Sequence, residues 1–79
     1  MRVLLFAQLR EAAGRGVLEF SVHRPLDQAQ LWAELERICP PLAAHRPITR
    51  LARNGEYARP DAHYTDTDEV ALIPPVSGG

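Results

Sequence analysis

The sequence predicts an α+β fold in which a mixed sheet of four to five strands carries one main helix packed on one face. Three observations lead to it: apolar runs near both ends of the chain, an amphipathic helical segment between them, and an Asn54-Gly55 hairpin signal in the second half. The 79 residues suffice for one small domain.

The first strand is expected over Arg2–Leu9, an apolar run that strand alternation divides between two faces. Leu4 and Phe6 lie on one face, and the other carries Val3, Leu5 and Ala7. Because both faces are apolar, either the strand is central and covered on both sides, or Leu4 and Phe6 await a partner. A connection follows, with one helical turn over residues 10–13 stopped by Gly14. A second strand over Val17–Val22 then pairs with the first as a hairpin.

The main helix is expected to begin after Asp27, which with Gln30 has the spacing of a capping box. Pro40 is expected to end it. The spacing of four, three and four residues predicts one buried stripe, made of Leu31, Leu35, Ile38 and Leu42. Trp32 flanks this stripe and is interpreted as a core residue.

The second half predicts a loop over Ala43–Pro47, a strand over Ile48–Arg53, and a short return strand, Glu56–Ala58, after the Asn54-Gly55 turn. The last strand is expected over Glu69–Ile73, with Ala71 and Ile73 on one face. Because the first and last strands are the most apolar, we place them side by side at the sheet centre. This arrangement is the β-grasp of ubiquitin-like domains.

A tail over residues 74–79 is predicted to follow a globular domain over residues 1–73. Pro74 and Pro75 favour an extended path, so six residues would span roughly 20 Å. Gly78 and Gly79 have no Cβ and would pass a narrow channel. Such a tail presents one chemical group at its tip, the α-carboxylate of Gly79.

Composition excludes several classes of function. The net charge of −1 leaves no basic footprint for nucleic acid, and no apolar run approaches the length of a membrane span. The single cysteine, Cys39, suits a reducing cytoplasm, and no Cys/His spacing predicts a metal site. No signal peptide or nucleotide loop is recognisable. All nine basic residues are arginine, so the chain has no lysine side chain.

The sequence resembles the small subunit of molybdopterin synthase, a family of ubiquitin-like sulfur carriers. The specific part is the ending, Pro74-Pro75-Val76-Ser77-Gly78-Gly79 after Asp68-Glu69-Val70-Ala71. The segments Phe6–Glu11 and Ala52–Gly55 support the resemblance. Gly55 departs from the family, which usually has a longer side chain after this Asn, so the hairpin is expected to differ there.

The resemblance implies the chemistry of Gly79. An ATP-dependent adenylating enzyme, similar to ubiquitin-activating enzymes, would form a glycyl adenylate, and a sulfur donor would convert it to a C-terminal thiocarboxylate (1-thioglycine). The large synthase subunit would use that sulfur to build the dithiolene of molybdopterin from a cyclic pyranopterin precursor. No bound cofactor or independent catalytic site is implied for the small chain.

Two sets of residues follow for binding. The tail residues Pro74, Pro75, Val76, Ser77 and Gly78 would thread the partner's active-site channel. Leu4, Phe6, Ala71 and Ile73 are predicted to dock on the large subunit and to overlap the surface seen by the adenylating enzyme.

Other functions remain open from the sequence. Asn54-Gly55-Glu56 followed by Arg59-Pro60 is reminiscent of the sulfur carrier of thiamin synthesis, although those chains are shorter and lack Pro-Pro before the tail. A ubiquitin-like modifier would share the adenylation step but join its Gly-Gly to lysines of target proteins. A plain interaction domain is the remaining alternative.

Overall fold

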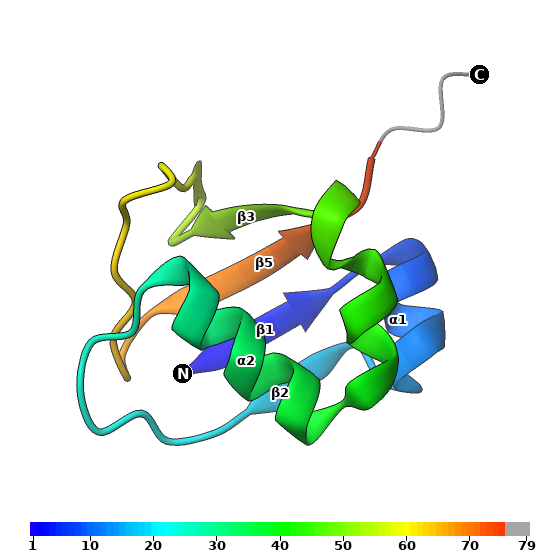
Figure 1. Cartoon of the computed structure of the whole chain (residues 1–79), viewed down its shortest axis with the longest axis horizontal. Helices are drawn as coiled ribbons and strands as arrows, with labels where there is room; N and C mark the ends of the chain where they lie inside the picture. Colours follow the sequence, from blue (N-terminus) through cyan, green and yellow to red (C-terminus); the bar gives the residue numbers. More distant parts are fainter. Residues whose placement is uncertain (76–79) are drawn as a thin grey trace.

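The computed structural model describes residues 1–75, which form a five-stranded sheet with helices over one face (Figure 1). The strand order is β2-β1-β5-β3-β4, so the first and last strands are central neighbours, as predicted. β1 (Arg2–Leu5) and β5 (Glu69–Ile73) are parallel, and the other pairings, made with β2 (Val17–Glu19), β3 (Arg50–Arg53) and β4 (Glu56–Tyr57), are antiparallel. The predicted mixed β-grasp sheet is confirmed.

The main helix, α2 (Gln28–Ile38), begins with the predicted capping box. The Gln30 backbone N–H donates to Asp27 Oδ1 at 2.7 Å, and the Asp27 N–H donates to Gln30 Oε1 at 2.9 Å. These bonds satisfy donors that a helix N-terminus otherwise leaves unpaired. The buried side chains of α2 are Leu31, Trp32 and Leu35.

The expected helical stripe is wrong beyond Leu35. Ile38 is 37% exposed, and Leu42 is fully buried but belongs to a separate 3₁₀ helix, η1 (Pro40–Ile48). Cys39 adopts φ −139° between the two helices and breaks the α-helical spacing. Leu42 therefore reaches the core through a change of chain direction after α2. The predicted loop over residues 43–47 is wrong as well, because these residues belong to η1.

The expectation of a strand continuing to Leu9 is also wrong. β1 ends at Leu5, and residues 7–13 form helix α1 (Ala7–Ala13). Phe6 is the N-cap, and its carbonyl accepts from the N–H groups of Leu9 and Arg10. Leu9 is the one buried residue of α1, so the helix leaves no apolar period that distinguishes it from a strand. Gly14 ends α1 at φ 75°, where glycine carries no steric penalty.

The remaining boundaries are close to prediction. β5 has the predicted range, whereas β2 ends at Glu19 and β3 begins at Arg50. The core lies between the sheet and the helices, and its largest fully buried side chains include Leu5, Leu9, Leu31, Leu35, Leu42, Tyr64 and Leu72.

The β3–β4 turn is tied to the start of β5. Asn54 and Gly55 form the turn at φ 52° and 89°, conformations that favour these two residue types. Asn54 Nδ2 donates to Asp68 Oδ1 at 2.9 Å, and Asn54 Oδ1 accepts from the Glu69 N–H at 2.9 Å. Asp68 also accepts from the Thr65 N–H at 2.8 Å, within the turn that precedes β5. One amide side chain thus positions the strand that leads into the tail.

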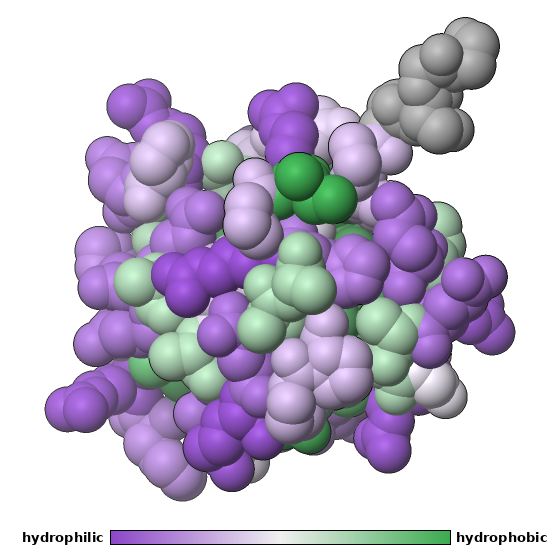
Figure 2. Space-filling model, turned by 45° about the vertical axis from the view of Figure 1, so that its right-hand side comes forward, coloured by the Kyte–Doolittle hydropathy of each residue, from purple (hydrophilic) through white to green (hydrophobic). Residues whose placement is uncertain are grey.

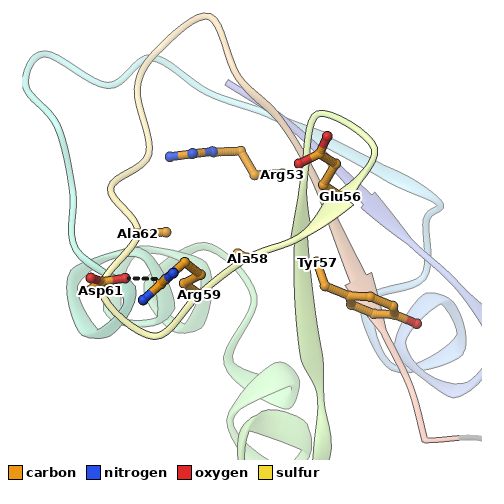
Figure 3. Close-up of a pocket in the computed structure, with 7 residues that line it drawn as sticks. All are labelled: Arg53, Glu56, Tyr57, Ala58, Arg59, Asp61 and Ala62. Carbon is orange, nitrogen blue, oxygen red and sulfur yellow. Dashed lines mark ion pairs between the residues drawn. The ribbon is translucent and has the colours of Figure 1, made fainter.

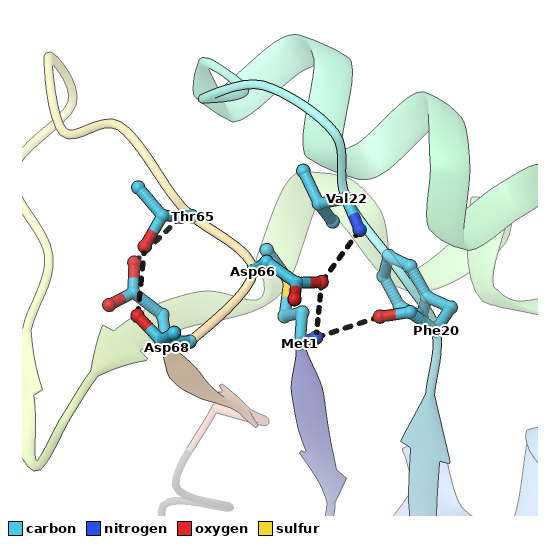
Figure 4. A network of polar contacts seen from close by, with 7 residues as sticks. Met1, Phe20, Val22, Thr65, Asp66 and Asp68 are labelled. Atoms are coloured by element: carbon cyan, nitrogen blue, oxygen red, sulfur yellow. Dashed lines mark hydrogen bonds and ion pairs between the residues drawn. The ribbon is translucent and has the colours of Figure 1, made fainter.

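Asp66 connects Met1, at the start of β1, to the segment after β2 (Figure 4). Its Oδ1 accepts from the Val22 N–H at 2.8 Å and from the Met1 ammonium at 3.3 Å, and that ammonium also donates to the Phe20 carbonyl at 2.7 Å. The Val22 N–H and then the ammonium hold the pKa of Asp66 below its usual value. Asp66 therefore links its own loop to the start of β1 and to the segment after β2.

Candidate functional site

The two central strands present different faces to the helices and to solvent. Their helix-facing residues, which are Val3, Leu5, Val70 and Leu72, are 0–2% exposed. The alternate residues Leu4 and Ala71 are directly opposed in the parallel register and are half-buried. These two predicted docking residues therefore lie side by side on the sheet face away from the core.

One apolar residue from each of the other three strands continues this pair across the sheet. Leu4 opposes Val17 on β2, Ala71 opposes Ala52 on β3, and Ala52 opposes Tyr57 on β4. We call these five residues, Val17, Leu4, Ala71, Ala52 and Tyr57, the open-face row. Tyr57 is 57% exposed. In Figure 1 the helices lie over one face of the sheet, and the row lies on the opposite face, where Ala52 is itself only 7% exposed. An apolar row left uncovered in this way is typical of a protein interaction surface.

Phe6 and Ile73 stand at the end of this face from which the tail leaves. Each follows the Leu5–Leu72 pair by one position in the parallel register. Phe6 is 47% exposed, because it caps α1 and does not continue β1 as predicted. Ile73 is half-buried as the last residue of β5. The structure thus brings all four predicted docking residues to the two central strands, with Phe6 placed by a helix cap.

The open-face row is flanked by charged residues. On one side, Arg2 Nη1 lies 3.9 Å from Glu69 Oε2. On the other side, the Arg50 guanidinium lies 4.0 Å from the centre of the Tyr57 ring. Arg50 opposes Ile73, so this cation marks the tail end of the face.

The tail itself is only partly described. Pro74 is half-buried and Pro75 exposed directly after β5. The predicted threading residues Val76, Ser77 and Gly78, and the predicted reactive residue Gly79, lie outside the described residues.

Away from this face, one hollow formed by the described residues is not a comparable site. The hollow in Figure 3, about 300 Å³, is lined by polar and small side chains, and Arg59 pairs there with Asp61 at 3.4 Å. Tyr57 borders it but points to the other side of the hairpin. Within residues 1–75, no three His, Cys, Asp or Glu side chains are grouped to hold a metal ion. The surface seen in Figure 2, which includes the side bearing η1, mixes polar and apolar groups in small areas.

Sequence reasoning missed the outer members of the open-face row. Val17 and Tyr57 belong to edge strands whose register the sequence pattern does not give. Neither the exposed Arg50 nor Ala52, which is 7% exposed, was predicted on this face. The Asn54-Gly55 signal contained the necessary information, because a two-residue turn places Tyr57 opposite Ala52. Among the described residues, no helix is long and apolar enough to cross a membrane.

The sequence model described as the ThiS family matches residues 3–79. The chain belongs to the ThiS family. Together with the curated relatives described next, this match confirms the predicted resemblance to the molybdopterin synthase small subunit.

Two curated relatives of this ThiS family chain match it over nearly their whole length. It is 37% identical to the "Molybdopterin synthase sulfur carrier subunit" of Chlamydomonas reinhardtii, with 100% of this chain and 98% of the relative covered. Its identity to the protein of the same name from Dictyostelium discoideum is 35%, with 99% and 94% covered. Among solved structures, SAMP1 from Haloferax volcanii is similar with a TM-score of 0.83 and 31% identity, over 99% of this chain and 97% of that one.

Proposed function

We propose that this ThiS family chain is a sulfur carrier that acts as the small subunit of a molybdopterin synthase. Its full-length similarity to carrier subunits of that name supports the proposal. The observation that carries it is the junction at Ile73, where β5 runs from the apolar open face directly into Pro74-Pro75-Val76-Ser77-Gly78-Gly79. A carrier needs this combination, because one surface must bind a partner while an adjoining arm reaches into its active site.

The chemistry is assigned to Gly79. A partner enzyme transfers AMP from ATP to the Gly79 carboxylate, releasing pyrophosphate and forming an acyl adenylate. A donor that supplies sulfur at the hydrosulfide level displaces AMP and leaves a thiocarboxylate. The large subunit then takes this sulfur for the dithiolene of molybdopterin. The carrier supplies the C-terminal carboxylate to which the sulfur is attached, and its partner enzymes supply the catalytic residues.

The proposed partners are a large synthase subunit, an adenylating enzyme and a sulfur donor, and the chain itself is expected to act in the cytoplasm. The open-face row together with Phe6 and Ile73 would dock on the large subunit and would overlap the surface used by the adenylating enzyme. The two enzymes would then compete for the same carrier. Pro74, Pro75, Val76, Ser77 and Gly78 would pass through the channel of each enzyme in turn.

The decisive experiment compares the full chain with a variant that lacks Gly79. Removing Gly79 moves the reacting carbon by ~3.3 Å, and a displacement of about 1 Å already costs roughly 100-fold in a positioned reaction. Only the full chain should gain about 16 Da, sulfur replacing oxygen, when incubated with adenylating enzyme, ATP and sulfide. Both proteins should melt alike and bind the large subunit comparably. Sulfur transfer by the shortened chain would show that Gly79 does not carry the chemistry.

A protein modifier is the second candidate, favoured by the similarity to SAMP1, described as a small archaeal modifier protein in a second H. volcanii structure. Incubation with ATP and lysate of the host separates the two functions. High-mass adducts that depend on Gly79 would support a modifier, whereas a thiocarboxylated monomer supports a carrier. A thiamin-synthesis carrier would give the same monomer but would not bind the large synthase subunit.

A further inference from the structure

Arg50 lies where the open face meets the tail. It is the first residue of β3 and opposes Ile73, the last residue of β5. It stands two positions before Ala52, so strand alternation places its side chain on the same face as the open-face row. Any protein that covers Ala71 and Ile73 and receives the tail must also come close to Arg50.

The Arg50 side chain has an aromatic neighbour but no ion pair in the described chain. Its guanidinium lies 4.0 Å from the centre of the exposed Tyr57 ring. The arginines that form ion pairs within residues 1–75 are Arg2, Arg37, Arg46 and Arg59, and Arg50 is not among them. The ring attracts the cation through its π-face but does not occupy the outward N–H donors.

This contact leaves a pre-arranged donor set. A guanidinium held over an aromatic ring loses part of its rotational freedom before a partner arrives, and its planar fork suits a carboxylate. Covering Arg50 without an acceptor would instead bury an unpaired charge, which is strongly unfavourable.

We propose that the large synthase subunit presents a carboxylate side chain to Arg50, forming a bidentate ion pair beside the ring of Tyr57. The proposal rests on the proposed function, in that the open face is taken to dock on that subunit. It adds the chemistry of the partner surface: an apolar centre opposite the open-face row, and an acidic residue next to the channel that receives the tail.

The charge distribution on the face also sets the orientation of the partner. At the far side of the row, Arg2 pairs with Glu69 inside this chain, so that cation already has a partner. The Arg50 end is the cationic end of the face. A partner with one acidic residue on an apolar patch would therefore fit in a single orientation, with the acid at the tail.

Calorimetric binding of the full chain to purified large subunit gives the first test. Arg50→Gln should weaken binding by about 30-fold or more and reduce its salt dependence, because it removes the charge from a desolvated pair. The affinity of Arg50→Lys should fall between those of the wild type and Arg50→Gln, because an ammonium keeps the charge but cannot form the bidentate pair. Arg59→Gln is the matched control: the Arg59 side chain is 85% exposed and pairs with Asp61 away from this face, so affinity should change less than about twofold.

Cross-linking gives a direct second test because the chain contains no lysine. In the complex of Arg50→Lys with the large subunit, a carbodiimide should couple position 50 to an Asp or Glu of that subunit, forming an amide detected by mass spectrometry. Arg59→Lys should give no such link. If the wild-type complex forms but Arg50→Gln binds equally well, or position 50 gives no link, the ion pair is refuted. If the wild-type chain does not bind the large subunit at all, the proposed function itself fails.

Discussion

At the scale of single residues, Asn54 holds the strand that leads into the tail. Its left-handed backbone makes the β3–β4 turn, and its side chain uses both amide atoms on the start of β5. Asp68 accepts from the Asn54 side chain and from the Thr65 N–H, while the Glu69 N–H donates to Asn54 Oδ1. A substitution that keeps the turn but changes one hydrogen-bonding atom can separate the two roles.

Asn54→Asp should lower the free energy of unfolding by about 1–3 kcal/mol. The change replaces the Nδ2 donor with a carboxylate oxygen that faces the Asp68 carboxylate, while Asp still tolerates the positive φ. Urea denaturation measures the effect, and Glu56→Gln on the adjoining exposed strand serves as control. Equal midpoints for Asn54→Asp and wild type would show that this network does not stabilise the fold.

Asp66 predicts a specific dependence of stability on pH. Its pKa is lowered from the ordinary 3.8 in the folded chain, first by the Val22 N–H and then by the Met1 ammonium. A lowered folded pKa means that its contribution is fully present above the unfolded value and is lost as the pH falls through the folded value. Asp66→Asn should therefore flatten the fall in urea midpoint on acidification from about pH 6 to pH 2. Parallel curves for the two proteins would refute this role.

At the scale of elements, a helix could be predicted from the sequence where a short motif of a few residues defines its start. Asp27 and Gln30 predicted the start of α2 because a capping box is complete within four residues. The structure differs at α1 and η1 because neither shows a helical period: α1 buries only Leu9, and η1 buries only Leu42. Both helices form around core positions set by distant segments, which a single-sequence pattern does not contain.

The capping box gives the prediction for an element. Asp27→Ala should destabilise the chain by about 1 kcal/mol, because it removes the acceptor for the Gln30 N–H. Asp27→Asn should stay close to wild type, since Asn caps a helix about as well. Thermal unfolding of the three proteins checks the order. A loss as large in Asp27→Asn as in Asp27→Ala would assign the effect to charge rather than to capping.

The candidate site could also be predicted only where a local pattern of a few residues was enough. Alternation within β1 and β5 was enough to place Leu4 with Ala71, whereas the outer row depends on the register of both hairpins. The roles of the docking residues and of the tail, Gly79 included, stay predictions, and residues 76–79 lie outside the described structure.

At the scale of the whole molecule, the two faces of one sheet separate stability from binding. Leu5 is 2% exposed and faces the helices, whereas its neighbour Phe6 is 47% exposed at the edge of the open face. Leu5→Ala should cost about 2–5 kcal/mol of folding stability through the cavity it leaves. Phe6→Ala should cost much less stability but weaken binding to the large subunit by ~1–3 kcal/mol.

Urea denaturation and calorimetric binding of both variants check this division. If Phe6→Ala loses cooperative unfolding while its residual binding is normal, Phe6 is a core residue and the docking face must lie elsewhere. Leu5→Ala, studied below its melting temperature, controls for a general loss of structure.

The parallel pairing of β1 with β5 also has a consequence for the order of folding. Arg2 pairs with Glu69, so the centre of the sheet joins segments from opposite ends of the described chain. Contacts of such long sequence separation form late and slow the folding of small domains. During synthesis, β1 therefore lacks its central neighbour until β5, which directly precedes Pro74, has been made. The hydrophobic core can form completely only then. A chain cut short before β5 would remain open to proteases instead of competing for the partners of the finished protein.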